Sequence, residues 1–135
     1  MSDLAFLRER IESYADYTDD AARRLSDEQI RAYAGEALAR LRERLAPGGA
    51  EGQALEALLL RCQFVEQTKA RVFDATAVDA AQIAATAAAD RDVVNIADCA
   101  DTVAAADLGV LLVQLAAAFE RRWPAAGGTL DVPGR

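Results

Sequence analysis

The apolar residues near the start of the chain follow the period of an amphipathic helix. From Leu4 to Leu25 they recur at alternating spacings of three and four positions, which places them on one helix face. The pattern predicts a helix over residues 3–25. Its weak point is the stretch 16–20, where aspartates flank the β-branched Thr18.

Two boundary signals divide the next part of the chain. Ser26–Gln29 has the sequence Ser-Asp-Glu-Gln of a capping box, and we expect a second helix to begin there. Pro47–Gly49 predicts the end of that helix. The connection is short enough to bring the following helix, expected over residues 51–74, back antiparallel.

The C-terminal half of the sequence predicts two further helical regions. Thr76–Asp79 is a second capping box before an alanine-rich helix. Asp90–Asp92 can cap a last helical region that continues to about Arg122. Asp107 interrupts the apolar stripe of this region, and a lone carboxylate facing the core would be costly. We therefore interpret Asp107 as the cap of a new helix, with a buried catalytic acid as the alternative.

The remaining composition supports a helical fold throughout. Alanine, the best helix former, is abundant, and β-branched runs and hairpin signals are missing. A chain of 135 residues is long enough for one domain with its own core. We predict an all-α fold, an antiparallel bundle of four to five helices that forms a single domain over residues 1–123. Residues 124–135 are predicted to be a flexible C-terminal tail, since they contain turn residues and little to bury.

Charge and the missing residue types exclude several classes of function. The net charge of −7 argues against binding to nucleic acid, which needs clustered cations. Histidine is absent, so no imidazole base or histidine-containing metal site is possible. Cys62 and Cys99 lack CxxC spacing and are expected to stay reduced. No apolar stretch has the length of a signal peptide or a membrane span. We expect a cytoplasmic protein that does not enter the membrane.

Pairs of acidic residues three positions apart are the closest pattern to a catalytic site. Asp98 and Asp101 form one pair, and Glu9 and Glu12 form another. They resemble the paired acids with which all-helical nucleotide pyrophosphohydrolases hold Mg²⁺. Such a site needs several carboxylates on one inward face. At about 100° per residue, however, both pairs fall beside or opposite the apolar stripe. We expect no metal and no cofactor, and Asp98, Asp101 and Asp107 stay weak candidates for an acidic site.

The segment Leu108–Phe119 is apolar on more than one face. A helix of this kind must be surrounded, either by its own chain or by another copy. We expect the second case, because a chain with at most five helices can hardly enclose it. The residues off the core-facing stripe, which are the interface candidates, are Val110, Leu112, Val113 and Ala117.

The favoured function is thus a non-catalytic interaction or assembly module that forms a homodimer. The alternative is a small all-α hydrolase that uses carboxylates and Mg²⁺, of the nucleotide pyrophosphohydrolase kind. A third class, a helical bundle that binds a ligand in an apolar pocket, cannot be ranked against these two from the sequence.

Overall fold

The fold is known from a computed structural model that describes residues 2–15, 17–63 and 80–125. These residues form five α-helices and one 3₁₀ turn with their connections, and no strand occurs among them. The helices are α1 (Asp3–Arg10), α2 (Asp20–Leu45), α3 (Gly49–Gln63), α5 (Ala80–Cys99) and α6 (Leu108–Ala125), and the 3₁₀ turn η1 is Ala105–Asp107. The prediction of an all-α bundle is confirmed.

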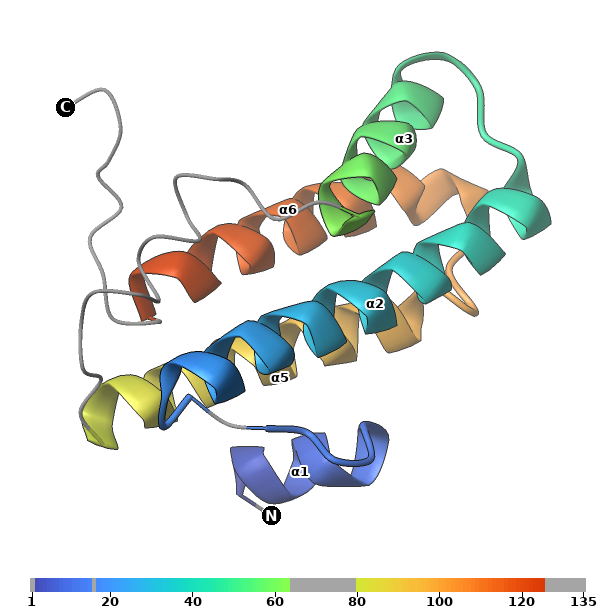
Figure 1. Cartoon of the computed structure of the whole chain (residues 1–135). Helices are drawn as coiled ribbons and strands as arrows, with labels where there is room; N and C mark the ends of the chain where they lie inside the picture. Colours follow the sequence, from blue (N-terminus) through green and yellow to red (C-terminus); the bar gives the residue numbers. More distant parts are fainter. Residues whose placement is uncertain (1, 16, 64–79, 126–135) are drawn as a thin grey trace, which may run out of the picture.

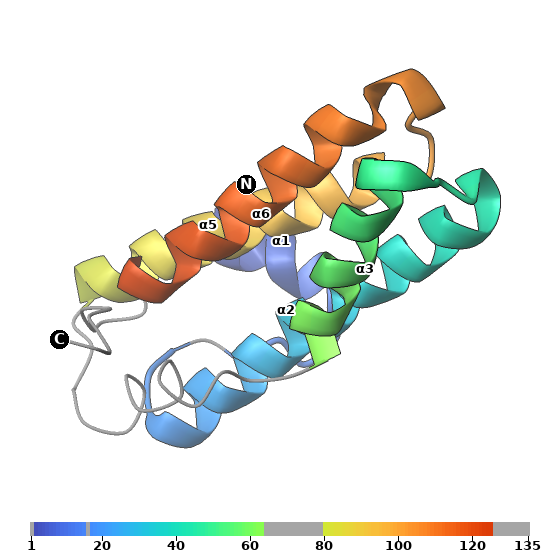
Figure 2. The same ribbon diagram turned by 90° about the horizontal axis from the view of Figure 1, so that it is seen from above.

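The bundle consists of two antiparallel hairpins, α2 with α3 and α5 with α6. Tyr33 of α2 contacts Asp98 in α5, and Arg40, further along α2, contacts Asp101 just after the end of α5, so these two helices run parallel. Figure 1 shows α3 and α6 above α2 and α5, with α1 beneath them. Seen from above, in Figure 2, α6 lies along α5. The core between the hairpins is built from aliphatic side chains such as Leu38, Leu55, Val93 and Leu115, each fully buried.

The predicted first helix is interrupted at Ile11. Ser2 caps α1 by accepting a hydrogen bond from the Ala5 amide at 3.1 Å, and the backbone leaves the helical path at Ile11. The loop that follows is held by the Gln29 side chain, which accepts from the Ala15 amide and donates to the Ser13 carbonyl. The prediction of one helix over residues 3–25 was therefore wrong, because side chains stabilise a turn within it.

The second helix begins earlier than the capping box indicated. Asp19 is its N-cap and accepts from the Ala22 amide at 2.7 Å. Ser26 and Asp27 lie in the middle of α2 and are buried. The predicted end is confirmed: Ala46 adopts the left-handed conformation (φ 43°), and α3 starts at Gly49 (φ 61°). A glycine adopts this conformation without strain.

Helix α5 runs without a break through Asp90–Asp92, so the cap predicted there was wrong. Asp107 closes η1 directly before α6, so a new helix begins where it was expected to, and the exposed side chain contradicts the alternative of a buried acid. The expected helix end at residue 74 and the box Thr76–Asp79 lie outside the described residues, as does most of the predicted tail. Helix α6 includes Pro124 and Ala125, the first two tail residues. None of the described helices combines the length and apolar character that crossing a bilayer requires.

Candidate functional site

The outward face of α6 carries large apolar side chains in water. Val110 is 60% exposed and Val113 is 70% exposed, and Ala117 is exposed one turn further along. The exposure expected of these three residues is thus observed. Leu112 differs: it is only 3% exposed. Its assignment to the outward face was wrong, because α3 packs against that flank of α6 and extends the buried arc.

A groove of about 490 Å³ lies between α3 and α6. Its walls come from α3 and α6 in similar measure, and most of them are apolar. The lining residues are Ala50, Glu51, Ala54, Ala57, Leu58, Arg61, Gly109, Leu112, Val113 and Ala116. We call these ten residues, together with Val110 and Ala117, the α3–α6 face. The groove exists because α3 presents alanines here and leaves room that longer side chains would fill.

The two charged residues of the groove mark its two ends. Glu51 lies beside Gly109, where an added Cβ would be 3.1 Å from the Glu51 carboxylate. Arg61 donates to Glu120 at 2.8 Å and lies 5.7 Å from the centre of the Phe119 ring. Since Glu51 adjoins the start of α6 and Arg61 its later turns, α3 and α6 run in the same general direction, and Figure 2 shows them crossing obliquely.

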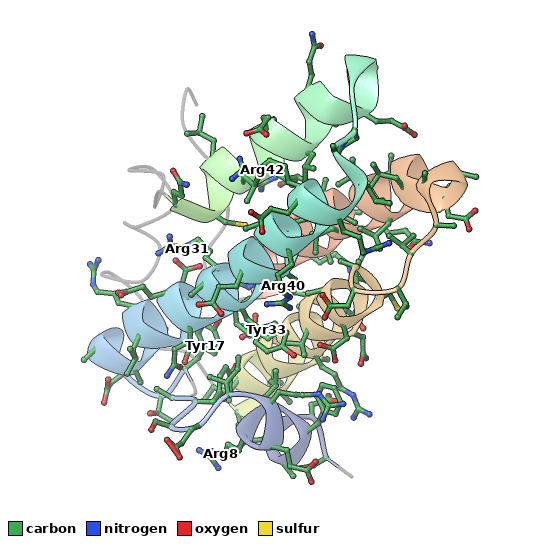
Figure 3. All side chains as sticks on the ribbon, turned by 90° about the vertical axis from the view of Figure 1, so that its right-hand side faces the viewer. Arg8, Tyr17, Arg31, Tyr33, Arg40 and Arg42 are labelled. Carbon is green, nitrogen blue, oxygen red and sulfur yellow. The ribbon has the colours of Figure 1, made fainter. Side chains whose placement is uncertain are left out.

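The acidic candidates Asp98 and Asp101 are engaged by side chains of α1 and α2. Asp98 accepts from the Tyr33 hydroxyl at 2.5 Å and from Arg10 at 3.3 Å. Asp101 accepts two bonds from Arg40, at 2.9 and 3.2 Å, and these bonds lower the pKa of its carboxyl. Figure 3 shows Tyr33 and Arg40 between α2 and α5.

Asp107 does not join these two carboxylates, because it lies in the separate 3₁₀ turn. Among the described residues, no three or more acidic or cysteine side chains are grouped so that they could hold a metal ion. Asp98 therefore links α5 to α1 and α2, and Asp101 links the segment after α5 to α2; each carboxylate pairs with an arginine.

A buried polar cluster lies on the opposite side of α6 from Val113, and the sequence analysis missed it. Asp90 is fully buried and accepts from Arg122 at 2.6 Å, from Tyr14 at 2.6 Å and from Tyr17 at 2.8 Å. Arg122 also donates to the Tyr17 hydroxyl at 3.2 Å. The cluster ties the loop after α1 to α5 and α6.

Helix α2 extends this cluster. Asp27 lies 3.0 Å from the Arg122 guanidinium and accepts from Arg31 at 2.9 Å. Arg31 in turn donates to the Cys62 carbonyl at the end of α3, and Figure 3 shows Tyr17 and Arg31 near this end of the bundle. We call Tyr14, Tyr17, Asp27, Arg31, Asp90 and Arg122 the Asp90–Arg122 cluster.

Burial governs the ionisation of this cluster. It raises the pKa of Asp90, against the opposing effect of Arg122 and the three hydrogen bonds. It also raises the pKa values of the Tyr14 and Tyr17 hydroxyls, and the charge of Asp90 adds to both shifts. The Cys62 thiol beside the cluster has a pKa of about 11 for the same reason, burial. The tyrosines and the thiol are therefore protonated at neutral pH, and they act as donors and packing groups in place of nucleophiles.

A sequence signal for this cluster did exist. Asp90 precedes Val93 and Ala97 by three and seven positions, so it falls on their buried stripe. Arg122 follows Leu115 by seven positions, on the buried stripe of the next helix. A carboxylate and a guanidinium on the inward stripes of two adjacent helices predict a buried pair, because either alone would be costly.

Comparisons of the chain with protein-family models, with curated proteins and with solved structures found no match. The described structure offers two regions with a possible functional role, the Asp90–Arg122 cluster and the α3–α6 face. The Asp90–Arg122 cluster is closed and its polar groups contact one another. The α3–α6 face is open and mostly apolar.

Proposed function

We propose that this protein is a helical assembly module that self-associates through the α3–α6 face. The supporting observation is the exposure of Val110 and Val113 beside a groove with mainly apolar walls. Large contiguous apolar patches on soluble proteins mark interfaces, whereas single exposed aliphatic residues do not. A closed dimer is the commonest arrangement that removes such a patch from water.

Burial of the exposed valines against a second copy is favoured in free energy over their exposure to solvent. Complete burial of a valine contributes roughly 1.5–3 kcal/mol. In a two-fold dimer each copy contributes its own Val110 and Val113, so four valine side chains become buried. This gain must exceed the entropy lost on association. The alanines of the groove help here, since they lose almost no side-chain freedom when they become buried.

The substitution Val113→Asp tests the proposal. It places a charge in the contact without touching Leu111 or Leu115 on the core side of α6. The matched control is Leu25→Asp, because Leu25 is also a large exposed side chain (45%) but lies on α2. We expect a dimer by light scattering at micromolar concentration for the parent and for Leu25→Asp, and a folded monomer for Val113→Asp. A parent that stays monomeric at that concentration contradicts self-association.

The hydrolase alternative has less support from the described contacts. A Mg²⁺ ion at Asp98 and Asp101 would have to displace Arg10, Tyr33 and Arg40 from the carboxylates. A cytoplasmic location belongs to the proposed function as well. It fits the two free cysteines, one of them exposed at Cys99, and the net charge of −7 fits a partner other than nucleic acid.

A further inference from the structure

We infer that the N-terminal part of the chain is a strap that opens and closes on the bundle as one unit. The strap comprises the described residues 2–15 and 17–19, that is, α1 and the loop that leads into α2. The part that it covers is the four-helix body of α2, α3, α5 and α6. The strap lies on the side of this body away from the α3–α6 face (Figure 1), so the inference does not depend on self-association.

Two tyrosine hydroxyls fasten the strap to the body. The side chains of Tyr14 and Tyr17 are buried, and both hydroxyls donate to the same oxygen, Oδ2 of Asp90, at 2.6 and 2.8 Å. A carboxylate oxygen has two lone pairs, so Oδ2 can accept both hydrogen bonds together. The other oxygen, Oδ1, accepts from Arg122 of α6. We call the two tyrosine hydrogen bonds the latch, and both depend on one buried carboxylate of α5.

The charged pairs behind the latch lie within the body itself. Arg122 of α6 binds Asp90 of α5 and Asp27 of α2, and Asp27 also binds Arg31. When the strap leaves, Asp90 keeps its counter-charge, and water can take the place of the tyrosine hydroxyls. Opening therefore avoids the large cost of a buried charge without a partner. The aliphatic core between the two hairpins comes from the body helices and also stays in place.

Helix α1 depends on the body for its structure. It has eight residues, and a helix of that length is not stable alone in water. Phe6 and Leu7 are buried where α1 packs against α5, and the Phe6 ring lies 4.4 Å from the Arg91 guanidinium. Arg91 also binds Asp3, but this ion pair is partly exposed and such pairs contribute little to stability. We therefore expect α1 to lose its internal hydrogen bonds whenever it leaves α5.

The loop between α1 and α2 contains a strained residue that favours opening. Ser13 has a φ of 66°, which is uncommon for a residue other than glycine. The Gln29 side chain on α2 holds this conformation, because it donates to the Ser13 carbonyl at 3.0 Å and accepts from the Ala15 amide at 3.1 Å. Such strain persists only while the surrounding contacts maintain it. Opening relaxes the backbone at Ser13 and gives water access to Asp90.

Hydrogen exchange of the full chain, followed by NMR for each amide at low urea concentrations, tests the strap. We expect the helical amides of α1 and the Tyr14 amide, which donates to the Ile11 carbonyl, to share one free energy of opening. Their exchange should be about tenfold or more faster than that of the slowest amides in α5, because partial opening requires less free energy than global unfolding. Strap amides as protected as those of α5, or amides that only fray one by one, would overturn the inference.

Substitutions separate partial opening from global unfolding. Leu55 is buried on α3, so Leu55→Ala should accelerate exchange in α5 and leave the strap rates unchanged within about twofold. Tyr14→Phe removes one hydrogen bond of the latch and should accelerate strap exchange about tenfold. The slowest α5 amides should accelerate by the same factor, since this bond is lost on global unfolding too. The matched control is Tyr33→Phe: its hydroxyl joins α2 to Asp98 within the body, so strap exchange should not change.

The outcomes distinguish the strap from the latch and from the α3–α6 face. Strap amides that accelerate together with α5 in Leu55→Ala would show that the chain opens only as one cooperative unit, which overturns the strap. Unchanged strap exchange in both Tyr14→Phe and Tyr17→Phe would overturn the latch. In light scattering, Tyr14→Phe should have the same mass as the parent, and a smaller mass would place the strap in the interface between copies and overturn its independence of the α3–α6 face.

Discussion

Helix α6 contains both the most deeply buried arginine of the described bundle and one of its most exposed valines. Arg122 is 1% exposed, whereas Val113, fewer than three turns away, is 70% exposed. From hydropathy alone one would expect the valine to be buried and the arginine to be exposed. The difference lies in their neighbours: Arg122 meets Asp90 and Asp27, while Val113 lies at the edge of an open groove. At both positions, therefore, the neighbouring groups determine whether the side chain is buried, and hydropathy does not.

The largest expected effect comes from removing Arg122. Arg122→Ala leaves Asp90 and Asp27 buried without this counter-charge, and breaking a buried pair in this way costs about 3–5 kcal/mol. We expect a loss of that size in the free energy of unfolding, measured with urea. The control is the neighbouring Arg121→Ala, whose pair with Asp92 is half exposed and should contribute less than about 1 kcal/mol. Equal losses for the two variants would mean that the cluster does not hold the helices together.

The helix class was predictable from the sequence, but the boundaries were less so. The stripes of α2 and α6 and the turn at Pro47 follow from helical period and backbone chemistry, which act locally. The boundaries predicted at Ser26–Gln29 and Asp90–Asp92 were wrong because the same polar residues serve either as helix caps or as buried partners. Only a residue distant in sequence decides between the two, such as Arg122 for Asp90.

The outward face was predictable to the same limited degree. Periodicity identifies Val110, Val113 and Ala117 as residues opposite the core. It fails at Leu112, which lies at the margin of the stripe, where the packing of a second helix decides whether the side chain is covered. The groove itself requires α3 to lie beside α6 with its alanines inward, and this information is not contained in the pattern of either helix alone.

Two substitutions in α6 compare a buried residue with an exposed one by their effects on the free energy of unfolding. Leu112→Ala removes a buried side chain and should lower the free energy of unfolding by about 2–5 kcal/mol. Val110→Ala should change it by less than about 0.5 kcal/mol, because an exposed side chain already contacts water. Both are measured by urea unfolding at protein concentrations below the dissociation constant of the dimer. A large loss for Val110→Ala would show that its own chain covers this residue.

A gradual alkaline loss of stability reports on the tyrosines of the Asp90–Arg122 cluster. Burial raises the folded-state pKa values of Tyr14 and Tyr17 above the ordinary value of about 10. Their contribution is therefore complete below pH 10 and decreases as the pH rises towards the folded-state values, by about 1.4 kcal/mol per tyrosine and pH unit. Tyr33 is less buried, and burial together with its bond to Asp98 raises its pKa to about 12. In an alkaline titration followed by tyrosinate absorbance and circular dichroism, Tyr33 should ionise near that pH in the folded protein, whereas Tyr14 and Tyr17 should ionise only as helicity is lost. Ionisation of all three near pH 10 with unchanged helicity would show that water reaches Asp90, and the contrast between a closed cluster and an open face would fail.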